Sequence, residues 1–526
     1  MALSTIETGK PSPVEASPKA LLGVIDIGSN TIRMAIAQVM ADGRIQILEQ
    51  LQRAVRLGQD TFQKGQLSSE TLRESVAILR DFRHLLDTYG VESIRAVATT
   101  AIREARNGDT FVDRVLMATG LEVSPITVAE ESRLMVAAVR QVASDLLVQS
   151  QGTLIVEVGG GSTLLNILEK GELIQSQSLP LGTVRMMEAL SLRGDTAEHT
   201  AQLIRNEVSS AFNAFKSTFS FKQIQTFIAL GGDVRWAARQ TDPTEVVKEI
   251  QCLSKEYLKR LIERCQQYTA DELSHHYGMP FADAETLIPA LLVYQGLLNA
   301  TKARTILVPQ VSMRDGLLWD LALSVMGNKD ETLIHQCLKS AKTIAKKYRV
   351  DLEHAQCIME LATRIFDCLQ DRHHMNDRHR LLMQVAALLH EIGTFVSTRS
   401  HHKHSMYIIT HSELFGLTQD EVAMVANIAR YHRRSRPKPS HSEYMSMPRE
   451  RRLIVNKLAA ILRVADALDI SHSQQLRDIE MQIKKQRFVI HNKGRSDLTL
   501  EKKSLAGKGD MFEDIYGLQV QIEQQY

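Results

Sequence analysis

The strongest constraint on the fold of this chain is a pattern of strands and glycine turns that occurs twice. Residues 21–51 comprise an apolar strand ending in an acid, LLGVID, then the turn IGSN, the strand TIRMAIAQV, an Asp-Gly turn and a third strand. Residues 153–179 repeat this order with TLIVE, VGGGS, TLLNILE, a Lys-Gly turn and ELIQSQSL. Asp26 and Glu157 occupy the same place, directly before the glycine turn. The sequence therefore predicts a duplicated three-stranded meander.

The glycines of the second turn suggest a binding function. Each of Gly159, Gly160 and Gly161 costs about 0.5–1 kcal/mol relative to alanine in backbone entropy. A plain hairpin that needs a positive φ angle would require one or two glycines rather than three. Turns without Cβ atoms can bring backbone N–H groups close to an anion such as phosphate. We therefore expect the turns to line an anion-binding cleft, with a plain hairpin as the alternative.

Helical and strand patterns alternate between the two repeats. Apolar residues recur every three or four positions from Ser68 and Ser69 to Gly90, which predicts an amphipathic helix. SIRAVATTAI and LEVSPITV are typical of strands, whereas FVDRVLMAT and AEESRLMVAAVRQVAS are typical of helices. This alternation predicts α/β domains with largely buried central sheets. Two such domains, each opened by a meander, would face each other across a cleft.

Length and composition narrow the class of protein. The 526 residues exceed the roughly 250–300 over which one core keeps growing, so we expect three or four domains. A net charge of +2 argues against a surface covered by a nucleic-acid-binding field. Five cysteines without a CxxC pair fit a reducing compartment. No segment approaches the ~20 apolar residues of a membrane span, and residues 1–20 lack signal-peptide features, so we expect a disordered tail on a cytoplasmic protein.

Seven stretches resemble the exopolyphosphatase/guanosine pentaphosphatase family, whose fold belongs with the actin, Hsp70 and sugar-kinase ATPases. They occur in the order of the family: VIDIGSNTIRM (24–34), VATTAIREARN (97–107), VAEESRL (128–134), LIVEVGGGST (154–163), LPLGTVRM (179–186), IALGGDVRWAA (228–238) and VSMRDGLLWDL (311–321). The resemblance implies an α/β fold with two actin-like, ribonuclease H-like lobes around a cleft. It also implies an all-α, HD-like domain and a small α+β domain after them.

The resemblance assigns roles to residues of this chain. It implies that the following residues bind the phosphate-containing substrate: Gly28, Ser29, Asn30, Gly159, Gly160, Gly161, Ser162, Thr163, Gly231 and Gly232. Arg103 would contact phosphate, and Glu131 would be the general base of a metal-assisted water attack. Asp26 and Glu157, brought together by the duplication, are suited to hold Mg²⁺ mostly through water.

Three of these residues also have a purely structural interpretation. Arg103 could be a surface arginine at the end of a strand, and Asp26 could form a turn. Glu131 follows Glu130 at an expected helix start, where the helix dipole favours acids without any catalytic role.

The chain departs from the family pattern at two positions. Glu157 stands where the family has Asp, which lengthens the reach of the carboxylate by one methylene. Leu164 stands where the family has Glu, which removes a carboxylate and bears directly on metal binding.

Residues 330–478 show helical periodicity. His354, His390, Glu391 and Asp466 resemble the metal ligands of HD phosphohydrolases, but Glu391 stands where the HD pair has Asp. We therefore favour an HD-like module without a working metal site. Beyond it, MQIKKQRFVIHN, SDLTLEKKS and YGLQVQI predict a small sheet, with a helix around DMFEDIYG.

A local basic cluster covers residues 430–457, with nine Lys or Arg against two Glu. It is either a solvated surface without a partner or a patch whose field attracts a long polyanion.

Together these patterns predict a phosphoric anhydride hydrolase: an exopolyphosphatase that uses Mg²⁺ to release terminal orthophosphate processively from inorganic polyphosphate. The alternatives are a guanosine pentaphosphate 5′-phosphohydrolase, an ATP-dependent small-molecule kinase and a non-catalytic polyphosphate sensor. The resemblance also implies a homodimer, and we expect no membrane or nucleic-acid partner. The expected divisions are a tail (1–20), two lobes (21–135 and 136–326), a helical HD-like domain (327–478) and a C-terminal domain (479–526).

Overall fold

The computed structural model divides the chain into two compact units, Met1–Asp330 (unit 1) and Glu331–Tyr526 (unit 2). It describes residues 6–7, 18–40, 43–190, 197–215, 221–241, 246–247, 250–326, 331–433, 435–476, 479–492 and 497–524. Of the predicted tail, residues 1–5 and 8–17 lie outside the described residues, and Ile6–Glu7 forms strand β1. None of the described helices combines the length and apolar composition needed to cross a bilayer.

The first sheet of unit 1 confirms the first predicted meander. Strands β2 (Pro18–Ile27), β3 (Thr31–Met40) and β4 (Ile45–Ala54) pair in antiparallel fashion. On its other edge β2 pairs in parallel with β5 (Ser93–Ala98), which pairs in parallel with β6 (Val123–Pro125). The complete order is β1-β4-β3-β2-β5-β6.

The second sheet repeats this arrangement and confirms the predicted duplication. Its strands are β7 (Thr153–Val158), β8 (Thr163–Glu169), β9 (Glu172–Leu179), β10 (Thr226–Leu230), β11 (Val246–Val247), β12 (Ile250–Ser254) and β13 (Thr305–Val308). Within the order β11-β12-β13-β10-β7-β8-β9, the run β9-β8-β7-β10-β13 matches β4-β3-β2-β5-β6 in every parallel and antiparallel pairing. Only the antiparallel strands β12 and β11 are added.

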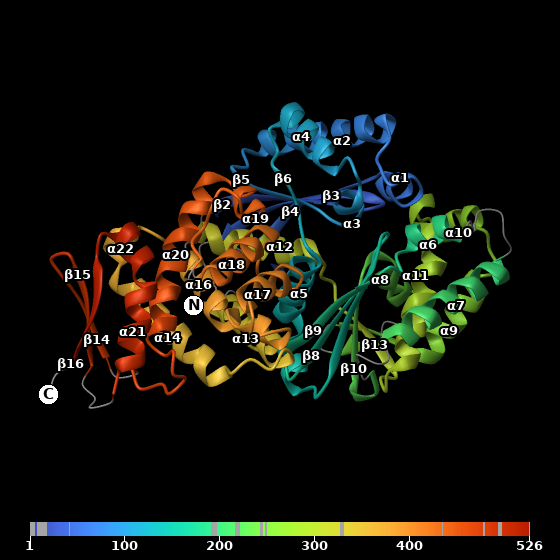
Figure 1. Ribbon diagram of the computed structural model, residues 1–526. Coiled ribbons are helices and arrows are strands. Elements are labelled where there is room, and N and C mark those ends of the chain that lie inside the picture. Colours follow the sequence, from blue (N-terminus) through green and yellow to red (C-terminus); the bar gives the residue numbers. More distant parts are fainter. Residues whose placement is uncertain are drawn as a thin grey trace. The chain divides into compact units, whose positions relative to one another are not determined.

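Helices cover both sheets of unit 1 (Figure 1). On the outer side of the first sheet, the helices whose apolar faces pack into the core are α2 (Ser69–Tyr89) and α4 (Gly108–Thr119). On the outer side of the second sheet they are α7 (Ala197–Phe215), α9 (Lys255–Cys265) and α11 (Phe281–Ala300). On the inner sides, α12 (Met313–Met326) packs on the first sheet and α5 (Val128–Gln149) on the second, and the two helices pack on each other. One hydrophobic core joins both inner sides, so the two lobes are held together.

Short helices complete unit 1. They are α1 (Leu57–Lys64), α3 (Thr100–Glu104), α6 (Thr183–Ala189), α8 (Gly232–Arg239), α10 (Ala270–Tyr277) and the 3-10 helix η1 (Phe221–Gln223). None of the five cysteines, all of which lie in described parts of the chain, forms a disulfide bond.

Helix-capping residues predicted some element boundaries correctly, whereas other predicted boundaries were wrong. The predicted helix α2 is confirmed: the Ser68 side chain accepts a hydrogen bond from the Thr71 N–H, and Gly90 ends the helix with a φ of 70°. The predicted strand SIRAVATTAI is too long, because helix α3 begins directly after Thr99. The predicted strand LEVSPITV also shrinks to three residues, since Thr127 already caps helix α5 through the Glu130 N–H.

Unit 2 is helical up to residue 467, as predicted. Its helices are α13 (Glu331–Lys347), α14 (Leu352–Cys368), α15 (Gln370–His373), α16 (Asp377–Leu389), η2 (Ile392–Phe395), α17 (His401–Thr410), α18 (Gln419–Arg430), α19 (Ser442–Met445) and α20 (Arg449–Ala467). A three-stranded sheet follows, with β14 (Ile479–Lys484), β15 (Arg487–Asn492) and β16 (Gln519–Gln524). The sheet shares one hydrophobic core with the helices.

Two helices connect β15 to β16, namely α21 (Thr499–Lys508) and α22 (Asp510–Tyr516). The helix predicted around DMFEDIYG is confirmed as α22. The strand predicted at SDLTLEKKS is wrong, because the segment from Thr499 onward belongs to α21, and Leu498, which precedes the helix, and Leu505 within it are buried in the core.

The basic cluster at 430–457 is partly neutralised within unit 2. Arg436 forms ion pairs with Asp510 and Asp514, and Arg451 forms one with Asp420 at 2.7 Å. Attraction of a polyanion to this segment stays a prediction.

Candidate active site

A cavity of about 640 Å³ lies in unit 1, and both glycine turns line it. The predicted site residues that line it are Asp26, Gly28, Ser29, Asn30, Glu131, Glu157, Gly159, Gly160, Gly161, Ser162, Gly231 and Gly232. Segments separated by up to about two hundred residues are thus brought to one place by the two meanders, helix α5 and helix α8. Only Arg103 and Thr163 of the predicted set are not among the lining residues.

These two side chains have other contacts. Thr163 is buried at the start of β8, where its hydroxyl donates to the carbonyl of Leu181 at 2.7 Å. The Arg103 guanidinium forms an ion pair with Glu131 and donates to the Ile126 carbonyl at 2.6 Å. It also donates to the Thr100 hydroxyl at 3.2 Å. Arg103 therefore fixes the carboxylate of Glu131 rather than lining the cavity itself.

The two turns have the same backbone geometry. The N–H of Gly28 donates to the carbonyl of Thr31 at 3.0 Å, and the N–H of Gly159 donates to the carbonyl of Ser162 at 2.9 Å. Each turn closes an antiparallel hairpin whose last residues direct side chains toward the cavity. In the first hairpin Asp26 pairs with Arg33, whereas in the second Glu157 pairs with Leu164.

Close packing explains two of the three consecutive glycines. A Cβ atom on Gly161 would lie 2.7 Å from Phe62 and 2.8 Å from Thr100, and one on Gly160 would lie 3.1 Å from the Cβ of Ser29. Gly159, Gly160 and Gly161 all have φ angles outside the positive region, so the plain-hairpin interpretation is wrong. Glycine lets the second turn pack directly against the first lobe while its backbone stays open to the cavity.

Five carboxyl groups line the cavity, those of Asp26, Glu131, Glu157, Asp233 and Asp283, and the first three were predicted as site residues. Burial raises the pKa of Glu157 to about 7, and the negative charge of Asp26 adds to this effect. Burial likewise raises the pKa of Asp26, with the charge of Arg33 acting in the opposite direction. The pKa of Glu131 is raised by burial against the opposing charge of Arg103. Closely spaced buried carboxylates of this kind fit a hard cation with oxygen ligands, such as Mg²⁺.

The cavity is also lined by four arginines that were not predicted as site residues. They are Arg33, Arg235, Arg239 and Arg314. Burial lowers the pKa of Arg235 and of Arg314, but guanidinium groups stay protonated in proteins. Arg33 was detectable in principle, because it lies as far after the first turn as Asp26 lies before it. Arg235 and Arg314 lie inside the stretches 228–238 and 311–321.

The N-terminus of helix α8 forms another part of the wall. Gly231 has a φ of 124°, and a Cβ there would lie 3.0 Å from the hydroxyl of Tyr294. That hydroxyl accepts the N–H of Val158 at 3.0 Å and donates to the carbonyl of Leu230, so it ties the ends of β7 and β10 together. A helix N-terminus favours an anion, and here the carboxyl of Asp233, in the first turn of α8, already lies in the cavity, where burial raises its pKa to about 7.

One portion of the cavity wall is aromatic and apolar. It includes Trp236, Tyr277, Met279 and Pro280. The rings of Trp236 and Tyr277 are in edge contact, with centroids 4.9 Å apart. This wall is suited to a planar apolar group rather than to phosphate.

Comparison with known proteins decides the family. The sequence profile of the Ppx/GppA phosphatase family matches residues 35–325, more than half of the chain, and that of Ppx/GppA phosphatase domain III matches residues 338–508. The chain belongs to the Ppx/GppA phosphatase family. The predicted family resemblance is thereby confirmed.

Similar proteins carry two different names. This phosphatase is 24% identical over 445 residues to a guanosine-5′-triphosphate,3′-diphosphate pyrophosphatase of Photobacterium profundum, covering 84% of this chain and 85% of that protein. It is 25% identical to the protein of the same name from Aliivibrio fischeri, covering 84% and 86%. The crystal structure of an exopolyphosphatase from Cytophaga hutchinsonii is 24% identical, with a TM-score of 0.52 over 59% of this chain and 99% of that chain. The fold class predicted for unit 1 agrees with this structural likeness.

Proposed function

We propose that this phosphatase is an exopolyphosphatase, which hydrolyses the terminal phosphoanhydride bond of inorganic polyphosphate. The observation that carries the proposal is that two equivalent glycine turns open onto one cavity, which four arginines also line. A row of phosphoryl groups presents many oxygens to such a site, and arginine and backbone N–H groups are their natural donors. The turns and the arginines would hold the oxygens from both lobes.

Glu131 would act as the general base in this reaction. Its carboxylate would take a proton from a water molecule as the water oxygen bonds to the terminal phosphorus and the bridging P–O bond breaks. The products are orthophosphate and a polyphosphate one residue shorter. Arg103, paired with Glu131, would keep the carboxylate ionised and pointed at the water.

Asp26 and Glu157 would hold Mg²⁺, which supplies positive charge that neutralises phosphoryl oxygens. Leu164 lies opposite Glu157 and offers no oxygen, so these two carboxylates would share the ion with water and substrate. Arg33 and Arg314 would contribute the remaining charge on the side of the first lobe.

A second candidate substrate is guanosine pentaphosphate. It is favoured by the aromatic wall at Trp236 and Tyr277, on which a guanine base could pack. It is also favoured by the name of the two bacterial relatives.

A side-by-side assay tests the proposal. Orthophosphate release is measured from long-chain polyphosphate and from guanosine pentaphosphate without any acceptor, for wild type, Trp236→Ala and Trp236→Phe. We expect a higher kcat/KM for polyphosphate and less than about a threefold effect of either substitution on it, since no base needs the ring. A higher kcat/KM for guanosine pentaphosphate that Trp236→Ala abolishes and Trp236→Phe retains would establish the second candidate instead. Absence of acceptor-free phosphate release would point to a kinase or a sensor.

A further inference from the structure

Unit 2 contains a buried histidine cluster that the phosphatase site does not use. His354 lies on α14, His390 directly follows α16, His401 begins α17 and His432 follows α18. All four side chains are buried, His390 completely. The cluster lies in the interior of the helical unit, where an unpaired polar nitrogen is unfavourable.

Two of these histidines present unpartnered nitrogens to a common point. One ligand atom each of His354, His390 and Glu391 lie within 4.8 Å of one another. Within the described parts of the chain, neither Nε2 of His354 nor Nε2 of His390 has a hydrogen-bond partner. A buried orphan nitrogen normally signals a missing ligand or water, and here two such nitrogens occur beside a carboxylate.

Hydrogen bonds fix the tautomers of both rings. The Nδ1 of His354 lies 2.8 Å from a carboxylate oxygen of Asp469, and the Nδ1 of His390 lies 2.7 Å from the carbonyl oxygen of Ala387. Both oxygens can only accept, so each Nδ1 carries the hydrogen and each neutral ring has its lone pair on Nε2. This is the arrangement by which outer hydrogen bonds orient metal-binding histidines.

His401 and His432 form a second pair with the same property. Their Nδ1 atoms face the carbonyl oxygens of Thr398 at 3.3 Å and of Ala429 at 2.5 Å. Their Nε2 atoms, which then both carry lone pairs, lie only 3.1 Å apart. Two facing lone pairs repel unless a cation lies between them. A separation of about 3.0–3.4 Å is that of two ligands on one ion with bonds of about 2.0–2.1 Å.

The two pairs adjoin each other. The ring centroids of His390 and His432 are 5.0 Å apart, and those of His354 and His390 are 5.4 Å apart. Asp466 approaches the Nε2 of His390 to 3.8 Å, but its other oxygen forms an ion pair with Lys508. Lys508 thus offsets the charge of Asp466 and engages one of its oxygens, so the histidines and Glu391 are the stronger candidate ligands.

We propose that His354, His390 and Glu391 bind a divalent transition-metal ion such as Zn²⁺, and that His401 and His432 supply ligands for a second ion beside it. This reverses the expectation drawn from Glu391, since glutamate replaces aspartate without loss of an oxygen ligand. Imidazole nitrogens favour Zn²⁺ or Fe²⁺ over Mg²⁺, so this site differs in metal class from the carboxylate site of unit 1.

Metal content tests the proposal on the full chain. The protein is stripped with a chelator, exchanged into Zn²⁺ buffered by a competing chelator, and measured by elemental analysis. The Glu157→Gln background removes one ligand from the unit 1 cavity. We expect at least one tightly bound Zn²⁺ per chain, lost in His354→Gln and His390→Gln. Asp469→Asn, which removes the partner of His354, should weaken binding by about 10–100-fold.

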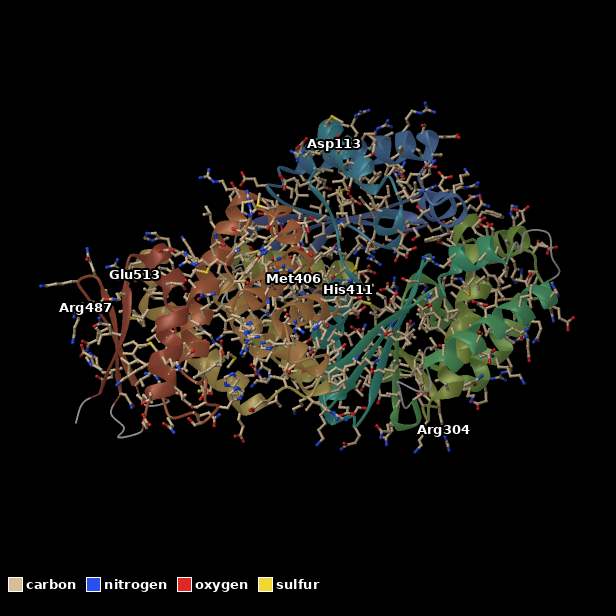
Figure 2. The ribbon with its side chains drawn as sticks, in the orientation of Figure 1. Asp113, Arg304, Met406, His411, Arg487 and Glu513 are labelled. Carbon is tan, nitrogen blue, oxygen red and sulfur yellow. The ribbon has the colours of Figure 1, made fainter. Side chains whose placement is uncertain are left out.

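His411→Gln is the matched control. His411 is exposed on the same unit and is labelled in Figure 2. Its substitution should leave the Zn²⁺ content unchanged. Equal content in wild type and in His390→Gln, or no retained Zn²⁺ in wild type, would overturn the proposal.

A second measurement avoids variants that fail to fold. X-ray absorption at the zinc edge of the loaded wild type should show nitrogen or oxygen ligands with the outer scattering typical of at least two imidazoles. A spectrum with oxygen ligands alone would overturn the proposal.

Discussion

The two meanders of unit 1 have the same backbone and different charges. Each closes its turn with the same hydrogen bond, from Gly28 to Thr31 and from Gly159 to Ser162. In the first, Asp26 is paired across the hairpin with an arginine; in the second, Glu157 is paired with a leucine.

The difference changes what each acid can do. Arg33 partly offsets the effect of burial on the pKa of Asp26. Burial and the charge of Asp26 raise the pKa of Glu157 to about 7, although Arg235 and Arg33 act in the opposite direction. The first turn carries the side chains of Ser29 and Asn30, and the second carries bare backbone at Gly160 and Gly161. The duplication thus supplies two equivalent backbones, in which the acid before the turn faces an arginine in the first hairpin and a leucine in the second.

The largest expected effect on activity comes from substitution of Glu131, which belongs to neither meander. Glu131 lies on helix α5, which connects them, and Glu131→Gln should lower kcat by about 10²–10⁴-fold with little change in KM, as loss of a general base does. Steady-state phosphate release checks this. Glu122→Gln, at an exposed position of the same lobe, is the control. Full activity of Glu131→Gln would remove Glu131 from the mechanism.

The second prediction compares equivalent turn positions. Gly161→Ala places a methyl group against Phe62 and Thr100, so it should destabilise unit 1 by about 1–3 kcal/mol. Displacement of the turn should also lower kcat/KM by up to about 10²-fold. Asn30→Ala, at the matching position of the first turn, removes atoms rather than adding them and should destabilise unit 1 much less. Thermal unfolding of the two variants measures this difference, and equal destabilisation would mean that close packing of the second turn is unimportant.

The third prediction uses the pKa of Glu157. Because this group holds a proton up to about pH 7, Mg²⁺ must displace that proton at lower pH. The apparent dissociation constant for Mg²⁺ should therefore rise as pH falls from 7 to 6, by at most about tenfold per unit. Calorimetric titration at several pH values measures it, and Glu157→Gln should flatten the dependence. A wild-type affinity independent of pH would contradict the assignment of Glu157 as a ligand.

The fourth prediction, with the smallest expected effect, concerns Leu164, which lies opposite Glu157 in the second hairpin. Leu164→Glu adds a carboxylate opposite Glu157 and should lower the half-saturating Mg²⁺ concentration by roughly three- to tenfold, since ligand charge tunes the affinity of such sites. Leu164→Gln has the same length without the charge and should not do so. Identical Mg²⁺ dependence in the two variants would show that position 164 does not reach the ion.

Sequence patterns predicted the parts of unit 1 that depend on local order. The order of strands and turns in the sequence predicted both meanders, and the capping residues Ser68 and Gly90 predicted the two ends of helix α2. Segments where two short elements join without a glycine were predicted poorly. After Thr99 the chain turns directly into α3, and no breaker residue marks the change.

The walls of the cavity were harder to predict because they come from distant segments. Arg235 and Arg314 reach the site only after β10 aligns beside β7 and β13 aligns beside β10. Unit 2 shows the same difficulty. His401 and His432 belong to different helical segments, and their spacing in the sequence does not predict the contact between their rings. The role of the glycines was also misjudged in part, since packing between lobes requires them as much as any ligand.

A crystal structure of Glu131→Gln with bound tripolyphosphate tests the central claim most directly. We expect one phosphate chain whose oxygens contact backbone N–H groups of both turns, 28–31 and 159–162, with its terminal phosphorus beside position 131. A chain bound to one turn only, or bound outside the cavity, would contradict it.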